Sequence, residues 1–325
     1  FKEKLHSYQI TSAGIKEFRI SRSYSKNSGT IKLVPFEMLA TKGADKDYLR
    51  IRRTYILKAI QSSKTVEQIQ SYLKKYNLNN IGTETITDDI INFRRIGLEI
   101  SYSNKKYKLK DKIDILEIPN TTSKNNIGPS VLENTKQKLR EELKYLDHEY
   151  LDILDLSIAG KKSAIQFEVR IVELLNHIII AKHLTGGNKP EIIGYNPKEN
   201  PEDCIVIDSK AYGDGFQIPV NERDKMIRYI DEYNAKDEKL NKNKWWNNYK
   251  SPNFPTKEIK YSFVSSTFIG NYFQQLEYIK NRTGVSGSAI TAETLLRKVN
   301  NILNENNTYD VKNFFEELGC NALLI

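Results

Sequence analysis

The apolar run Cys-Ile-Val-Ile at residues 204–207, followed at once by Asp208, Ser209 and Lys210, most constrains the fold of this chain. The run is short, β-branched and bounded by turn-forming residues, which predicts a buried strand. Side chains two apart in a strand point to the same face, so Asp208 and Lys210 address one site while Ser209 points away. The sequence therefore predicts a sheet that presents an acid and a lysine together at a strand end.

A second short strand is expected just upstream, because Ile192 and Ile193 follow Glu191. The Asn-Pro-Lys-Glu-Asn-Pro stretch at residues 196–201 has the composition of a turn between the two strands. Pairing of these strands would bring Glu191 close to Asp208. Two adjacent carboxylates repel each other unless a cation lies between them, and hard oxygen ligands suit Mg²⁺.

Such a cluster has the chemistry of phosphodiester hydrolysis. A bound divalent cation would lower the pKa of a water molecule, and Lys210 would help to neutralise the charge that builds on the phosphate. Glu168 and Glu173, on a helix expected directly upstream, are candidate supporting acids. The residues alone leave an alternative open, since acid-x-lysine triplets at strand ends are often only solvated ion pairs.

Length and charge frame this hypothesis. A chain of 325 residues exceeds the usual size of a single core, so two domains are expected. Lysine and arginine number 50 against 41 acids, and the net charge of +9 favours a polyanionic partner, although a lysine-rich proteome would give the same balance. Two cysteines support neither a disulfide framework nor a cysteine zinc site, which fits a reducing cytoplasm.

The chain has no apolar stretch near the roughly 20 residues that span a bilayer, so no membrane partner is expected. The first residues lack a signal-peptide pattern and an initiator methionine. We therefore expect a piece of a longer protein, with residues 1–34 as the remnant of an upstream subdomain.

Residues 35–116 have the pattern of a winged-helix-like domain. A basic amphipathic helix is expected at residues 48–61, and a capping box at Thr65 and Gln68 begins a second helix. A third helix at residues 85–96 ends at Gly97, and a hairpin follows with strands at 99–102 and 106–109.

The third helix of a winged helix often reads DNA, but the same fold also serves as a protein-docking module. Here the helix carries Asp88 and Asp89 beside Arg94 and Arg95, and this mixed charge is poor for lying along phosphates. Both roles stay open, and no DNA-binding residue is assigned.

A linker is expected at residues 117–130, which are polar and rich in turn formers, and an α/β domain at 131–325. Its expected helices lie at 131–146, 148–157, 164–183 and 223–233, with a further strand at 261–265. Trp245 and Trp246 are expected in the core.

Several motifs resemble one known family, in the same order along the chain. Towards the N-terminus they are Phe36-Glu37-Met38-Leu39-Ala40-Thr41, Arg52-Arg53, Glu67-Gln68-Ile69-Gln70, Tyr107-Lys108-Leu109-Lys110-Asp111 and Ile118-Pro119. Further on they are Leu143-Lys144-Tyr145, His148-Glu149-Tyr150, Glu168, Glu173, Gly186-Gly187, Lys189-Pro190, Asp208-Ser209-Lys210-Ala211-Tyr212, Pro219, Asp224, Met226, Arg228-Tyr229, Trp245-Trp246, Gly270-Asn271-Tyr272 and Gln275-Leu276. Together they resemble the type IIS restriction endonucleases of the FokI family.

The resemblance implies a nuclease domain of the PD-(D/E)xK fold that cuts double-stranded DNA outside an asymmetric site and leaves 5′-phosphates. It implies Mg²⁺ as cofactor, with Mn²⁺ as a possible substitute, held by Glu191, Asp208 and the carbonyl oxygen of Ser209. Glu191, Asp208 and Lys210 would be the catalytic residues. The family has aspartate where this chain has Glu191, and the extra methylene moves the carboxylate outward.

The family cuts both strands through transient homodimers of the nuclease domain. By resemblance, the interface residues here are Asp224, Arg228 and Leu240, while Arg282 replaces an aliphatic contact. Asp224 and Arg228 lie four apart and could exchange ion pairs across a two-fold axis, or form a simple intrahelical pair.

Two alternatives to a double-strand endonuclease follow from these departures. The first is a DNA-binding or regulatory module in which Glu191 has weakened catalysis. The second is a nickase, which would arise if dimerisation fails. Independently of these alternatives, the resemblance implies that the winged-helix-like segment packs against the nuclease domain and restrains it until the recognition site is bound.

Overall fold

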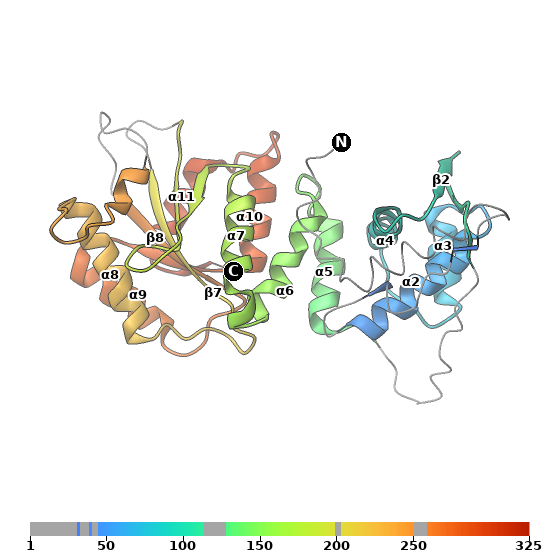
Figure 1. The fold of residues 1–325 in the computed structure, drawn as a ribbon, viewed down its shortest axis with the longest axis horizontal. Coiled ribbons are helices and arrows are strands. Elements are labelled where there is room, and N and C mark those ends of the chain that lie inside the picture. The colour runs from blue at the N-terminus through green and yellow to red at the C-terminus, as the bar shows by residue number, and fades with distance from the viewer. Residues whose placement is uncertain are drawn as a thin grey trace. The chain divides into compact units, whose positions relative to one another are not determined.

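The computed structural model describes residues 31–32, 39–40, 45–113, 128–198, 203–249 and 259–324. The chain divides into two compact units, an N-terminal unit of residues 1–142 and a C-terminal unit of residues 143–325 (Figure 1). Most of the remnant expected at residues 1–34 and most of the linker expected at 117–130 lie outside the described residues.

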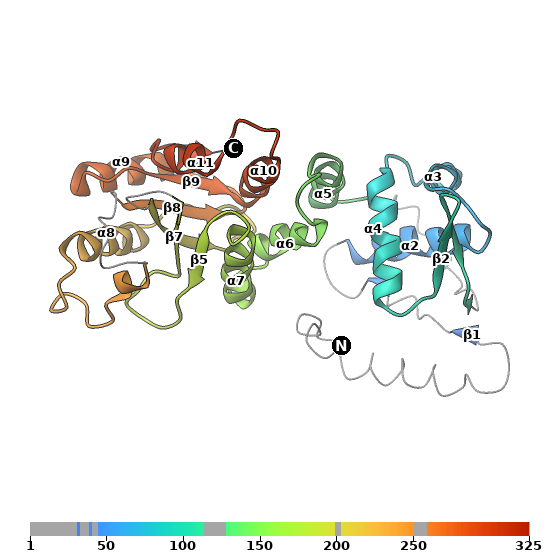
Figure 2. The ribbon, with the colours of Figure 1, turned by 90° about the horizontal axis from the view of Figure 1, so that it is seen from above.

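The N-terminal unit has three helices followed by a β-hairpin, in the predicted order (Figure 2). The helices are α2 (Lys46–Ile60), α3 (Val66–Lys74) and α4 (Thr83–Arg95), and the hairpin strands are β2 (Ile100–Ser103) and β3 (Lys106–Leu109). Thr65 and Gln68 form the predicted capping box at the start of α3. The winged-helix prediction is confirmed. The short strands β1 (Ile31–Lys32) and β4 (Lys112–Ile113) pair in parallel, and α5 (Val131–Glu142) completes the unit.

Apolar side chains of α2, α3, α4 and the hairpin form one core, in which Ile56, Ile69 and Ile86 are fully buried. A buried ion cluster lies beside this core. The Arg52 guanidinium of α2 donates to Asp89 of α4 at 2.8 Å and to Glu133 of α5 at 2.8 Å. This cluster fixes α5 against the helices of the winged helix.

The C-terminal unit is an α/β sandwich around a six-stranded sheet. The strand order is β10-β9-β8-β7-β6-β5. The pairs β5–β6 and β6–β7 are antiparallel, whereas β7–β8, β8–β9 and β9–β10 are parallel. The strands are β5 (Ile180–His183), β6 (Ile192–Tyr195), β7 (Cys204–Lys210), β8 (Ile259–Ser265), β9 (Gly287–Thr291) and β10 (Leu323–Leu324). The helices are α6 (Asp152–Ile158), α7 (Ala164–Leu175), α8 (Val220–Ala235), α9 (Tyr272–Thr283), α10 (Ala292–Leu303) and α11 (Val311–Leu318), with 3₁₀ turns η3 (His148–Leu151), η4 (Lys161–Ser163) and η5 (Trp245–Asn248).

Helices cover both faces of this sheet. Figure 1 shows the sheet between α8 and α9 on one side and α7 and α10 on the other. The largest core cluster fills the α8 and α9 side and includes Met226, Trp245 and Leu276. Trp245 and Trp246 are 1% and 7% exposed, which confirms that both belong to the core.

The prediction of one long helix at residues 164–183 was wrong. Helix α7 ends at Leu175, and Ile180–His183 forms the edge strand β5. The Asn176 side chain accepts a hydrogen bond from the Ala181 amide at 2.8 Å, which stabilises the break. Three β-branched residues at 178–180 favour a strand, and this local preference prevailed over the helical spacing of apolar residues that continues to Ile179.

In the sheet, the ring of a tyrosine lies close against the backbone of a glycine. Tyr261 of β8 lies directly opposite Gly287 of β9, and a Cβ at Gly287 would lie 2.4 Å from Cζ of the tyrosine ring. Glycine is therefore required beneath this ring.

Cys204 and Cys320 are both free thiols. Within the described ranges, no helix is both long and apolar enough to cross a membrane.

Candidate active site

The site predicted from the sequence forms where β6 and β7 meet. The two strands are antiparallel, and Ile192 lies opposite Ile207. Glu191 comes just before Ile192 and Asp208 just after Ile207, so both acids lie at the same end of the strand pair. The Lys210 ammonium lies 2.9 Å from Glu191 Oε1 and 2.5 Å from Asp208 Oδ1. The strand pairing thus brings together the three residues predicted to be catalytic.

Glu191 also contacts the backbone of β7. The Ser209 amide donates to Glu191 Oε2 at 2.9 Å, and the Ser209 hydroxyl lies 3.5 Å from the same oxygen. The glutamate side chain, although one methylene longer than aspartate, therefore has a defined position. Its carboxylate joins the main chain of β7 to the ammonium of Lys210.

A further carboxylate, that of Glu222, reaches the cluster from α8. Glu222 Oε2 lies 3.5 Å from the Lys210 ammonium, and Lys225 holds the same carboxylate from the outside at 2.9 Å. Glu222 is 9% exposed, and its pKa is lowered because the nearby Lys210 and Lys225 outweigh the opposing effect of burial. Lys210 thus contacts three carboxylates.

Electrostatics in this cluster favour the lysine cation and disfavour the aspartate anion. Burial alone would lower the pKa of Lys210, but Asp208 and Glu191 together raise it well above its ordinary value. Burial raises the pKa of Asp208 well above its ordinary value, and the charge of Glu191 adds to this increase while Lys210 opposes it. Without a further cation, Lys210 is thus held as an ammonium while the neighbouring carboxylates oppose each other's ionisation, and a divalent cation between them would relieve that repulsion.

The donor set fits Mg²⁺, which binds proteins through one or two carboxylates and completes its octahedron with water and phosphate oxygens. In the part of the chain that the structure describes, no three His, Cys, Asp or Glu side chains converge on a metal position. The Lys210 ammonium instead bridges Glu191 and Asp208. Glu191 and Asp208 thus supply two carboxylates, a number that suits Mg²⁺ and is too small for a closed protein cage.

The two supporting acids are placed differently. Glu168 Oε2 lies 2.6 Å from His183 Nε2, and the pKa of Glu168 is raised by burial and then by the charge of Glu191, which places this acid beside the site. Glu173 pairs with Arg170 at 2.7 Å and is half exposed. Five positions in a helix correspond to a rotation of roughly 140°, so the two acids point in different directions.

Sequence reasoning missed Glu222 and His183. Glu222 lies fourteen positions after Asp208 on another element, and no local spacing connects them. The signal for His183 was its place just before the Gly186-Gly187 turn and the acid cluster, but the expected long helix hid the strand that carries it.

The residues predicted for the interface lie on and after α8. Asp224 bonds to the neighbouring Arg223 at 2.7 Å, and Arg228 lies 3.5 Å from Glu232. The alternative of a simple intrahelical pair between Asp224 and Arg228 is therefore not what the structure shows, since each side chain has another partner. The Asp224 and Arg228 side chains are 55% and 43% exposed, and Leu240 is 60% exposed.

Comparison with known proteins identifies both units. The sequence model "FokI, cleavage domain" matches residues 130–323, and "FokI, D3 domain" matches residues 39–105. The chain is 34% identical over 295 residues to the type II restriction enzyme FokI of Planomicrobium okeanokoites, covering 90% of this chain and 50% of that protein. It is 31% identical over 306 residues to the type II restriction enzyme StsI of Streptococcus sanguinis, covering 90% and 49%.

Solved structures agree with the sequence matches. The restriction endonuclease FokI superposes with a TM-score of 0.84 at 31% identity, covering 97% of this chain and 55% of that one. FokI bound to DNA gives a TM-score of 0.83 at 30% identity, covering 97% and 54%. The chain spans about half the length of these relatives. With a cleavage-domain match over more than half of its residues, the chain belongs to the FokI family of type II restriction endonucleases.

Proposed function

We propose that this chain is the nuclease-bearing part of a type IIS restriction endonuclease. It hydrolyses DNA phosphodiesters with Mg²⁺ outside an asymmetric recognition site and leaves 5′-phosphate ends. The observation that carries the proposal is the convergence of Lys210 on Glu191 and Asp208, at 2.9 and 2.5 Å, at the paired ends of β6 and β7.

Glu191, Asp208 and the Ser209 carbonyl oxygen would hold the Mg²⁺ ion, with Mn²⁺ as a possible substitute. A bound divalent cation supplies Lewis-acid stabilisation of the phosphate and lowers the pKa of a water molecule. Glu191 suits this role because its carboxylate is fixed by the Ser209 amide and is 30% exposed, so it is reachable from solvent. Asp208 would supply the second charged oxygen.

Lys210 would act as a fixed cation at the reacting phosphate. Its raised pKa keeps the ammonium protonated, so its role is to donate hydrogen bonds to the phosphate or to the attacking water rather than to accept a proton. Glu222 would position Lys210 from α8 and compensate its charge, while Glu168 would hold His183 beside the site.

Double-strand cutting would need two copies of the nuclease domain. Asp224, Arg228 and Leu240 are exposed, so they are available to a second copy. An Asp224 carboxylate of one copy and an Arg228 guanidinium of the other would form reciprocal pairs in a transient homodimer.

The direct test is cleavage of supercoiled plasmid by the wild type, by Lys210→Ala and by Lys312→Ala, an exposed lysine on α11, with and without Mg²⁺. The wild type and Lys312→Ala should give linear DNA only with Mg²⁺ or Mn²⁺, while Lys210→Ala should give none. Open-circular product alone would indicate a nickase. DNA binding without cleavage would indicate a regulatory module and refute the proposal.

A further inference from the structure

The hairpin of the N-terminal unit has one face in the core and one in solvent. Ile100 pairs with Leu109 and both are buried, whereas the alternate pairs place Ser101 opposite Lys108 and Ser103 opposite Lys106 on the outer face. Lys105 lies in the turn between the strands. We define the basic wing as Lys105, Lys106 and Lys108, all of which are exposed.

The basic wing is not neutralised. No acid occurs between residues 100 and 110 of the sequence. Lys106 and Lys108 have no ion-pair partner among the residues that the structure describes. Glu67 is the nearby acid, and its pKa is lowered mainly by a hydrogen bond with Thr65 and to a smaller extent by Lys105.

The turn at the tip of the wing has a left-handed backbone conformation. Asn104 and Lys105 have φ of +51° and +58°, the left-handed pair of a two-residue hairpin turn. Glycine is the favoured residue at the second of these positions, because an L side chain there is sterically disfavoured. Lys105 nevertheless occupies this position, so its exposed ammonium lies at the end of the hairpin beside Lys106.

The helix that reads DNA in many winged helices is already engaged inside this unit. Asp88 of α4 pairs with Arg140 of α5 at 3.0 Å, and Asp89 is buried against Arg52. The mixed charge of α4 thus serves helix packing. The hairpin, by contrast, presents three exposed lysines close together in the sequence.

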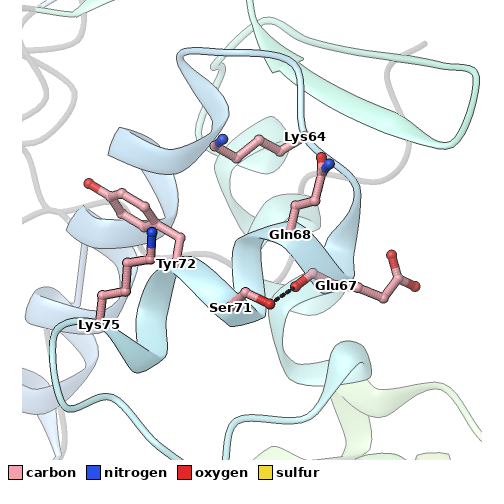
Figure 3. Close-up of a pocket in the computed structure, with 6 residues that line it drawn as sticks. All are labelled: Lys64, Glu67, Gln68, Ser71, Tyr72 and Lys75. Carbon is pink, nitrogen blue, oxygen red and sulfur yellow. Dashed lines mark hydrogen bonds between the residues drawn. The ribbon is translucent and has the colours of Figure 1, made fainter.

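A second feature extends the charged surface beside the wing. Lys64 and Tyr107 exchange two backbone hydrogen bonds, at 3.0 and 2.8 Å, so Lys64 runs along the hairpin. Lys64 and Lys75 line a surface cavity of about 310 Å³ with Tyr72, Gln68 and Ser71, and the Glu67 carboxylate points away from the two lysines (Figure 3).

We propose that the basic wing binds the phosphate backbone of double-stranded DNA. The contact is independent of base sequence, because lysine ammoniums on a serine-rich face provide charge without the planar donors that read base edges. This inference rests on the proposed function, which makes DNA the substrate, and it adds a contact at the end of the winged helix. The wing would hold flanking duplex while the nuclease domain cuts.

The test compares two triple variants of the 325-residue chain. One is Lys105→Gln, Lys106→Gln and Lys108→Gln; the matched control is Lys46→Gln, Lys74→Gln and Lys312→Gln, three exposed lysines elsewhere with the same change of net charge. Fluorescence anisotropy measures binding to a mixed-sequence duplex in EDTA, which prevents cleavage, over a range of salt concentrations. The wing variant should bind on the order of tenfold more weakly, and the slope of log K against log salt should fall by about one per lysine.

A single change provides an independent reading. Lys105→Gly removes the strained side chain, so its melting temperature should rise while its DNA affinity falls. A rise in stability without loss of affinity would overturn the role of Lys105.

The remaining outcomes distinguish failure of the DNA contact at the wing from failure of the proposed nuclease function. Equal affinity and equal salt slope in both triple variants would overturn the wing contact, even if plasmid cleavage persists. The same test measures binding to labelled polyglutamate. If the wing variant loses as much affinity for polyglutamate as for the duplex, then the wing is a general polyanion surface and the assignment to DNA is overturned. A wild-type chain that binds but never cleaves would refute the proposed function and leave the wing contact standing.

Discussion

Arg52 of α2 and Glu133 of α5 form a buried ion pair at 2.8 Å although they lie 81 positions apart in the chain. The same guanidinium bonds to Asp89, and all three side chains are at most 2% exposed. Glu133 falls within the match to the cleavage domain and Arg52 within the match to the D3 domain, yet both belong to the N-terminal unit.

Replacing Arg52 by methionine should destabilise the N-terminal unit by about 1–3 kcal/mol, because Asp89 and Glu133 lose the buried guanidinium that joins them and keep only Arg53 and Arg140, respectively. Urea unfolding of that unit measures the change. Arg95→Met, at an exposed position of α4, is the control and should be nearly neutral. Equal stability of the two variants would show that the buried cluster relaxes or admits water.

Asp208→Asn should abolish cleavage and raise the melting temperature at pH 8. The folded-state pKa of Asp208 is raised by burial, so the folded state holds this proton more tightly than the unfolded state and the ionised carboxylate costs stability as pH rises. The gain should vanish below about pH 4, near the pKa of an unfolded aspartate. Mg²⁺ should raise the melting temperature of the wild type but not of the variant, and a variant less stable at pH 8 would refute this account.

Glu191→Asp tests whether the glutamate at this position lowers the cleavage rate or is the side chain that the site requires. The shorter side chain would withdraw from the Ser209 amide and from Lys210, which now lie 2.9 Å away, and the cleavage rate should fall roughly 10- to 100-fold. Single-turnover cleavage measures the rate. A faster variant would instead support the hypothesis that Glu191 has weakened catalysis.

Glu222→Gln should lower the cleavage rate about 10-fold or more, as expected for a residue that orients a catalytic side chain, and leave duplex affinity unchanged. Lys225→Gln is the matched control, because Lys225 holds the same carboxylate from the exposed side. The NMR chemical shift of the Lys210 ammonium should change in Glu222→Gln, because this ammonium loses one of its three carboxylate contacts, and an unchanged shift would count against the positioning role.

Charge reversal tests the dimer. Asp224→Arg and Arg228→Asp should each reduce linear product from plasmid, and the double variant should restore it because the reciprocal pairs form again in the opposite sense. If the double variant cuts no better than either single one, then these residues do not pair across an interface.

The winged helix and the catalytic strand were predictable because their signals are local. The capping box at Thr65, the hairpin around Asn104 and the strand ending at Asp208 each depend on neighbouring residues alone. The approach of Glu191 to Asp208 followed from a single short strand pairing. Such features need no knowledge of distant contacts.

Contacts between elements that lie far apart in the chain could not be predicted from the sequence. Glu222 contacts Lys210 because α8 packs over the sheet. The helix that forms α5 was predicted, but its pairing with Asp88 of α4 through Arg140 has no local signal. At residues 164–183, helical spacing of apolar residues masked a turn at Asn176 and an edge strand. The prediction of a continuous helix failed because the helical spacing was given more weight than the β-branched run at residues 178–180.

The contact between Tyr261 and Gly287 couples the substitutions that these two positions can accept during evolution. Any side chain at 287 would collide with the tyrosine ring, so a change at 287 can persist only after 261 has first become smaller. Among diverging relatives, the two positions should therefore vary together, and an engineer who alters one must redesign both.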